Sequence, residues 1–354
     1  MKLLETTLHQ IEDQDRGVRA AAHARLEQLT MPYWALGRLM DLAEDLAGIT
    51  RSLRPPLARK KVVTMAGDHG IVASGVSKYP QEVTPQMVFN IVAGGAGINA
   101  LARAAGAEVV LADLGVAADL SALAAKGAIV SKRVGPGTRN FAVEPAMSRD
   151  EAVRSVEAGI EIAQDLGPTT DVFATGDLGI GNTTPSAAIV ATLTGCPVED
   201  VTGRGTGLDD EQLRRKIDVL KQALALHRPN PQDGLDVLAK VGGFELGGIA
   251  GLILGSAAQR KPVIVDGFIS NAGALLAQAL APRSVQYMIA SHGSVEPGHR
   301  AALDKLGKQA LVDLNLRLGE GTGAALVMPM LDAAARLLTD VATFAEAAVS
   351  TANG

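Results

Sequence analysis

The sequence is poor in aromatic side chains and in cysteine. Only 3% of its 354 residues are Phe, Trp or Tyr, and Cys196 is the single cysteine. One cysteine excludes an internal disulfide and fits a reducing compartment. Its place between Gly195 and Pro197 favours a small apolar residue over a nucleophile. With few aromatic residues, the core must be built from Ala, Val, Leu and Ile, which favours helices packed closely on a parallel sheet.

Excess positive charge and long uninterrupted apolar runs are also lacking. The formal net charge is −5, which argues against a nucleic-acid partner, because such a surface needs clustered Lys and Arg. The first residues, MKLLETTLHQIEDQD, turn acidic before a signal peptide could develop. The longest apolar stretch, residues 246–258, is too short and too rich in glycine to span a membrane. These features predict a cytoplasmic protein without a membrane span.

Six short apolar runs are present, and helix-length segments separate most of them. Such runs are typical of buried parallel strands, so we predict an α/β fold with an open, mainly parallel sheet and helices on both faces. The runs are 62–65, 109–112, 128–130, 172–174, 263–265 and 287–290. Ligands of such sheets bind beyond the carboxyl ends of the strands. The polar residues that fall at those ends are Asp68, His69, Asp113, Asp177, Asp266 and His292.

The two ends of the chain show a helical pattern instead. Apolar residues recur at helical spacing from residue 3 to about 48, and again after Gly323. We therefore predict a small helical domain made of residues 1–55 and 324–354, beside an α/β domain of residues 56–323. Within the latter, Ser148 with Glu151 predicts a capping box, and Thr84-Pro85 and Thr184-Pro185 predict two further helix starts.

Residues 171–189, DVFATGDLGIGNTTPSAAI, combine a strand, a glycine-rich turn and a helix start. Free amides at the start of a helix bind anions, and glycines let a ligand approach the backbone. The stretch predicts a phosphate or carboxylate pocket, and an ordinary strand-to-helix turn is the alternative. The later loop TGRGTGLDD leads into a helix bearing Lys216. That lysine could reach a phosphate, although helical lysines are more often solvated.

A carboxylate stands between two glycines in RLGEGTGAALVMP. Held in a glycine turn against an apolar pocket, Glu320 would have a raised pKa and could act as a general base. The alternative is a helix-start acid that interacts with the helix dipole. There is no P-loop, no dinucleotide fingerprint and no familiar zinc spacing around His69 or His292, so we expect neither a cofactor nor a metal.

An ordered series of motifs resembles one enzyme family across nearly the whole chain. The motifs are GDHGI, PQEVT, GDLGIGNTTPSAA, PNPQDGLDVLAKVGGFEL, VDGFIS and RLGEGTGAAL. They resemble the nicotinate-nucleotide:dimethylbenzimidazole phosphoribosyltransferases. The resemblance implies a cytoplasmic homodimer of cobalamin nucleotide-loop assembly. It also implies transfer of 5-phosphoribosyl from nicotinate mononucleotide to 5,6-dimethylbenzimidazole, giving α-ribazole 5'-phosphate and nicotinate.

The resemblance also assigns site residues. It places the catalytic glutamate on Glu320, the phosphate loop on Gly179, Gly181, Asn182 and Thr183, the phosphate lysine on Lys216, and the base pocket near Tyr79 and Met87. One position departs from the family pattern. Asp177 stands where a family glutamate is expected, so contacts made by the longer side chain do not carry over. Two alternatives remain, a phosphoribosyltransferase for another base and a nonenzymatic nucleotide-binding module.

Overall fold

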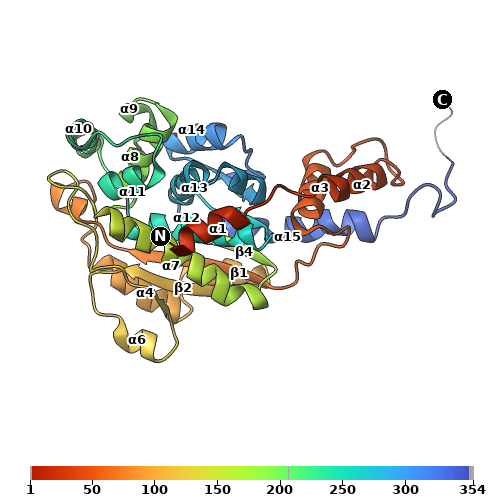
Figure 1. Ribbon diagram of the computed structural model, residues 1–354, viewed down its shortest axis with the longest axis horizontal. Helices are drawn as coiled ribbons and strands as arrows, with labels where there is room; N and C mark the ends of the chain where they lie inside the picture. Colours follow the sequence, from red (N-terminus) through yellow and green to blue (C-terminus); the bar gives the residue numbers. More distant parts are fainter. Residues whose placement is uncertain (1, 206, 351–354) are drawn as a thin grey trace.

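The computed structural model describes residues 2–205 and 207–350 (Figure 1). Its main sheet has the strand order β3-β2-β1-β4-β5-β6, and every neighbouring pair is parallel. The strands are β1 (Lys60–Gly67), β2 (Glu108–Gly115), β3 (Val130–Ser131), β4 (Val172–Leu178), β5 (Val263–Val265) and β6 (Met288–Ala290). This confirms the predicted open parallel sheet, in which the strand order reverses between β1 and β4. A separate parallel pair joins β7 (His292–Ser294) to β8 (Val312–Leu316).

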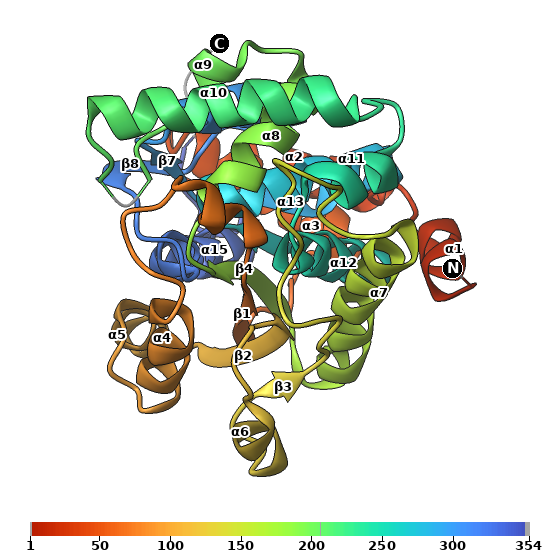
Figure 2. The same cartoon turned by 90° about the vertical axis from the view of Figure 1, so that its left-hand side faces the viewer.

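Helices cover both faces of the sheet (Figure 2). One face carries α7 (Arg149–Leu166), α12 (Phe244–Ala258) and α13 (Phe268–Leu280), and the other carries α4 (Val83–Val92), α5 (Gly97–Ala104) and α15 (Thr322–Thr339). Alternate residues of β1 point to opposite faces. Val63 and Met65 therefore join one apolar core, whereas Val62 and Ala66 join the other.

The remaining helices surround these layers. They are α1 (Lys2–Gln10), α2 (Arg16–Leu26), α3 (Arg38–Thr50), α6 (Ser121–Ala125), α8 (Thr183–Thr194), α9 (Val198–Val201), α10 (Asp210–His227), α11 (Gly234–Val241) and α14 (Pro297–Leu306). Within the described residues there are also three short 3₁₀ helices, η1 (Gly70–Ser74), η2 (Gly167–Thr169) and η3 (Pro282–Tyr287).

The two ends of the chain meet in space, although not completely. Helices α2, α3 and α15 pack together at the right of Figure 1, and Arg25 Nε donates a hydrogen bond of 2.7 Å to the Leu338 carbonyl. Helix α1 instead packs against α7 and α12. The division into domains of residues 1–55 with 324–354 and residues 56–323 stays a prediction.

Helices α7 and α12 approach each other so closely that their backbones touch. A Cβ atom added to Gly159 would lie 2.0 Å from the Gly248 carbonyl oxygen, and one added to Gly251 would lie 1.9 Å from the Val156 carbonyl oxygen. Real Cβ atoms do not come this near to backbone oxygens. Glycine is therefore required at this contact, which explains much of the glycine in α12.

The predicted helix starts had mixed outcomes. The capping box of α7 is confirmed, because Ser148 Oγ accepts from Glu151 N at 3.2 Å and Glu151 Oε2 accepts from Ser148 N at 2.7 Å. The starts at Thr84-Pro85 and Thr184-Pro185 are wrong by two residues, since α4 begins at Val83 and α8 at Thr183, two residues before each proline. Thr84 caps nothing. Its Oγ1 instead accepts a 3.0 Å hydrogen bond from Ile180 N, across to the glycine loop.

The stretch Val83–Ala104 is apolar enough and long enough to cross a membrane by composition alone. The chain breaks it into α4 and α5, with a left-handed Gly94 between them. Helices of 10 and 8 residues are each far short of the roughly 20 residues that a bilayer requires. The stretch is therefore two surface helices.

Candidate active site

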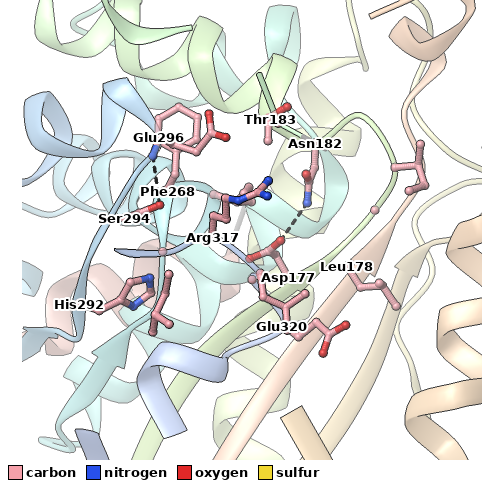
Figure 3. A pocket seen from close by; sticks show the side chains of 18 of the residues that line it. Asp177, Leu178, Asn182, Thr183, Phe268, His292, Ser294, Glu296, Arg317 and Glu320 are labelled. Atoms are coloured by element: carbon pink, nitrogen blue, oxygen red, sulfur yellow. Dashed lines mark hydrogen bonds between the residues drawn. The ribbon is translucent and has the colours of Figure 1, made fainter. Parts of the chain in front are cut away.

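A cavity of about 620 Å³ opens at the carboxyl ends of the strands, beside the reversal between β1 and β4 (Figure 3). Its walls come from the ends of β4, β5 and β6 and from the segments around β7 and β8. The lining residues are Tyr79, Asp177 to Ile180, Asn182, Thr183, Gly205, Gly267 to Ile269, His292, Ser294, Glu296 and Asn315 to Glu320. This is the predicted edge, and the volume is in the range of small-molecule sites.

One wall is the glycine loop that leads from β4 into α8. Gly179 has no room for a side chain, because an added Cβ would lie 2.2 Å from the Gly67 carbonyl oxygen. Gly181 is left-handed, with a φ of 86°. Asn182 Nδ2 donates a 2.9 Å hydrogen bond to Asp177 Oδ2, drawn as a dashed line in Figure 3. The loop is thus held from several sides while it presents the start of α8 to the cavity.

Lys216 reaches this loop from α10. Its side chain is fully buried, and Nζ donates to Thr183 Oγ1 at 2.8 Å and to the Gly203 carbonyl at 3.3 Å. Burial lowers the pKa of Lys216 to about 8, although the Glu296 carboxylate favours the charged form. The alternative of a solvated helical lysine is therefore wrong. A small hollow beside the cavity brings Lys216 together with Gly181 and Thr183.

Glu320 lines the opposite wall in an unusual backbone conformation. Its φ is 62°, which is left-handed and uncommon for a residue other than glycine. The side chain is only 5% exposed, and Oε2 accepts a 3.2 Å hydrogen bond from Ile98 N in the first turn of α5. Burial raises the pKa of Glu320, and the hydrogen bond from Ile98 opposes that rise only in part. A buried carboxylate of raised pKa facing a cavity is suited to accept a proton.

Two more carboxyl groups lie near Glu320, Asp177 in the cavity wall and Asp266 behind it. Asp266 is fully buried, and its oxygens accept from Gly321 N at 3.1 Å and Ala324 N at 2.9 Å. Burial raises the pKa of Asp266 to about 7 against these hydrogen bonds. Burial, and then the neighbouring Asp266, raise the pKa of Asp177 well above its ordinary value. The site therefore holds three carboxyl groups close together, and burial disfavours the charged form of each.

The structure brings together most residues predicted for the site. Tyr79, Asp177, Gly179, Asn182, Thr183 and Glu320 line the main cavity, and Gly181 and Lys216 line the adjoining hollow. Met87 belongs to neither lining. It sits on α4, packs against the apolar core of that face, and has its Sδ 4.0 Å from Asn90 Nδ2. The functional roles of all nine residues stay predictions.

The sequence predicted no place in the substrate site for several residues that share the cavity. Phe268 follows β5, and Ser294 is the last residue of β7. Glu296 lies beside Lys216. Arg317 points into the space above Asp177 in Figure 3. A signal did exist for two of them, because Phe268 lies in VDGFIS and Arg317 opens RLGEG. In both motifs, only the glycines and the acids carry a sequence-based prediction.

The histidines at the strand ends have protein partners. His69 Nε2 lies 2.8 Å from Glu245 Oε1 in a fully buried ion pair, and His292 Nδ1 lies 2.9 Å from Ser291 Oγ. In the part of the chain that the structure describes, no three His, Cys, Asp or Glu side chains are grouped to hold a metal ion.

Comparison with known proteins identifies the family. A sequence profile described as phosphoribosyltransferase matches residues 11–349. A relative from Syntrophotalea carbinolica, named nicotinate-nucleotide–dimethylbenzimidazole phosphoribosyltransferase, is 60% identical over 350 residues and 99% of both chains. The chain belongs to this phosphoribosyltransferase family. Another family member of the same name, from Desulfotalea psychrophila, is 56% identical over 99% of both chains.

A crystal structure of a protein with this name is also similar to the chain. A phosphoribosyltransferase of the same name from Thermus thermophilus superposes with a TM-score of 0.89 at 46% identity, covering 96% of this chain and 100% of the other. The chain is therefore an enzyme that transfers a phosphoribosyl group, and the nonenzymatic alternative is wrong.

Proposed function

We propose that this enzyme transfers the 5-phosphoribosyl group from nicotinate mononucleotide to 5,6-dimethylbenzimidazole, with Glu320 as the general base. The names of its relatives, which mention nicotinate nucleotide and dimethylbenzimidazole, support these substrates. The observation that carries the proposal is the meeting, in one cavity, of an anion-binding loop and a buried glutamate. Asn182 and Thr183 lie on one wall and Glu320 on another.

The anion-binding side holds the phosphate of the nucleotide. The start of α8 offers backbone N–H groups, Gly179 and Gly181 allow close approach, and Lys216 adds a positive charge beside Thr183. A phosphate fixed at this wall orients the ribose, and such orientation lowers the barrier by avoiding the entropy loss of a free encounter.

The chemistry needs one proton to be removed. One nitrogen of the benzimidazole attacks the anomeric carbon while the bond from that carbon to the pyridinium nitrogen breaks. Its electron pair goes to nicotinate, which leaves without a proton. The other benzimidazole nitrogen loses its proton to the Glu320 carboxylate. Attack opposite the leaving group inverts the anomeric carbon and gives the α product.

Replacement of Glu320 by Gln tests the proposal. We expect Glu320→Gln to lower kcat by about 10² to 10⁴, the usual contribution of general-base catalysis. The thermal unfolding midpoint and the affinity for nicotinate mononucleotide should stay near those of the wild type. Nicotinate release would be measured by chromatography. Near-normal turnover in a folded variant would remove Glu320 from the mechanism.

The acceptor is tested separately, by nicotinate release across a panel of benzimidazoles, purines and phenols. We expect the highest kcat/KM with 5,6-dimethylbenzimidazole. A purine or a phenol that exceeds it would favour the alternative of another base.

The homodimer and the cytoplasmic location are proposals as well. Apolar side chains stand exposed at the cavity mouth, with Tyr79 at 48% and Leu318 at 61% exposure, and exposed apolar groups often mark protein contacts. Sedimentation velocity should show a particle of two chains, and a single-chain particle at micromolar concentration would contradict the dimer.

A further inference from the structure

The backbone of Glu320 is hydrogen-bonded to two strands of the sheet. Thr64 Oγ1 on β1 donates a 2.8 Å hydrogen bond to the Glu320 carbonyl oxygen, and Glu320 N donates to the Asp177 carbonyl oxygen on β4 at 3.2 Å. Thr64 is fully buried. Its hydroxyl and the Glu320 carbonyl therefore satisfy each other in a place that water does not reach.

The next residues of the same turn are held from β5. The Asp266 carboxylate accepts from Gly321 N at 3.1 Å and from Ala324 N at 2.9 Å, and α15 has no cap from its own side chains. Asp266 thus caps α15 from 55 residues away in the sequence. Its own backbone N donates to Thr175 Oγ1 at 3.1 Å, which ties the cap to β4.

These contacts stabilise the left-handed backbone conformation of Glu320, which is unfavourable for an isolated chain. A left-handed backbone at a residue other than glycine costs about 1 kcal/mol or more, and it persists only where the surroundings impose it. The fit is tight as well. A Cβ added to Gly176 would lie 2.4 Å from the Glu320 carbonyl oxygen, so the turn rests directly on β4.

We propose that Thr64 and Asp266 are positioning residues, which hold the left-handed turn that aims the Glu320 carboxylate into the cavity. This inference rests on the proposed role of Glu320. Neither residue is among those that line the cavity. They act through the turn, so their loss should weaken proton removal and leave nucleotide binding intact.

Threonine offers a matched set of variants. Thr64→Val keeps the shape and removes the hydroxyl, while Thr64→Ser keeps the hydroxyl. The control is Thr170→Val. Thr170 is equally buried and its Oγ1 also donates at 2.8 Å to a backbone carbonyl, that of Leu166, but it lies at the amino end of β4, away from the cavity. Asp266→Asn serves as a second variant if Thr64→Val does not fold.

The experiment measures kcat and the KM for nicotinate mononucleotide, with folding checked by thermal denaturation. We expect Thr64→Val to lower kcat about 10- to 100-fold, the scale of a misplaced catalytic group, with KM changed by less than about twofold. Thr64→Ser and Thr170→Val should keep wild-type kcat. In a Glu320→Gln background, Thr64→Val should cause no further loss, because the group it positions is absent.

Two results would overturn the inference alone, without refuting the proposed base. The first is that folded Thr64→Val and Asp266→Asn both keep wild-type kcat while Glu320→Gln is inactive. Glu320 would then remain the proposed base, but it would not depend on Thr64 or Asp266. The other is an equal loss from Thr64→Val with and without Glu320. Normal turnover of Glu320→Gln would instead refute the proposed base, and the inference with it.

Discussion

Between α7 and α12, glycines let two backbones touch, whereas around the cavity they let the chain turn. Gly159 and Gly251 have ordinary backbone angles and are required because the opposite helix leaves no space. Gly181, Gly319 and Gly321 are left-handed, with φ of 86°, 83° and 93°. The first region uses glycine for packing alone, and the second uses it for conformation as well. A substitution should therefore cost mainly stability in one and mainly activity in the other.

The largest expected effect lies where the two regions meet. Glu245 stands in the first turn of α12, and its partner His69 lies beneath Gly179, whose added Cβ would be 3.3 Å from His69 Nε2. Both side chains of this pair are fully buried. Removing one partner of such a pair costs about 3–5 kcal/mol. We expect a loss of this size in the unfolding free energy of Glu245→Gln, measured with urea at pH 6.

The same pair predicts a pH dependence. Burial lowers the pKa of His69, but the Glu245 and Asp68 carboxylates outweigh it, so the pKa is raised above 6.5. A raised pKa stabilises the folded state fully below pH 6.5, and the contribution is lost as the pH rises through the folded value. The difference between wild type and Glu245→Gln should therefore shrink from pH 6 to pH 9. A constant difference would show that His69 is not protonated in the pair.

Gly159→Ala addresses the packing region alone. The added methyl group meets the Gly248 carbonyl, and overpacking of this kind costs about 1–3 kcal/mol. The control is Gly17→Ala in α2, where the methyl meets only Asp15 Oδ1 at 3.3 Å and should change stability by less than about 1 kcal/mol. Both folded variants should keep wild-type kcat. A loss of kcat in folded Gly159→Ala would contradict the view that glycines between α7 and α12 affect stability and not activity.

The pH dependence of kcat/KM for nicotinate mononucleotide tests the cavity region without testing the packing region. Lys216 must be protonated to attract phosphate, and its pKa is lowered to about 8. Above that pH, kcat/KM for nicotinate mononucleotide should fall roughly tenfold per pH unit, because this ratio reports the free enzyme. The unfolding free energy should not follow the same curve. A flat kcat/KM from pH 7.5 to 9.5 would count against phosphate binding by Lys216.

Tyr79 and Met87 give the smallest expected effect. Tyr79 lines the cavity, and loss of an aromatic contact is worth about 0.5–1.5 kcal/mol, so Tyr79→Ala should raise the KM for dimethylbenzimidazole up to about tenfold. Met87 lies outside the lining, and Met87→Ala should change that KM by less than about twofold. An equal rise in both variants would place Met87 at the base after all.

Much of the fold could be predicted from local pattern. Buried parallel strands must be apolar on both faces, which is why runs such as 62–65 and 172–174 identified β1 and β4 correctly. The capping box at Ser148 was also predictable, because both of its hydrogen bonds are made within four residues. The site was harder. The partner of Thr84 is Ile180, 96 residues away, and nothing in the spacing around Pro85 points to it.

The sequence by itself determined that polar residues and glycines follow the apolar strands and gather at one edge of the sheet, and its ordered motifs pointed to the family. Only the tertiary structure decided how charged groups behave there. Lys216 is buried because α10 lays it against Thr183, and Glu320 is left-handed because β1, β4 and β5 hold its turn. Burial and backbone strain arise from segments distant in the chain, so no local pattern of residue types encodes them.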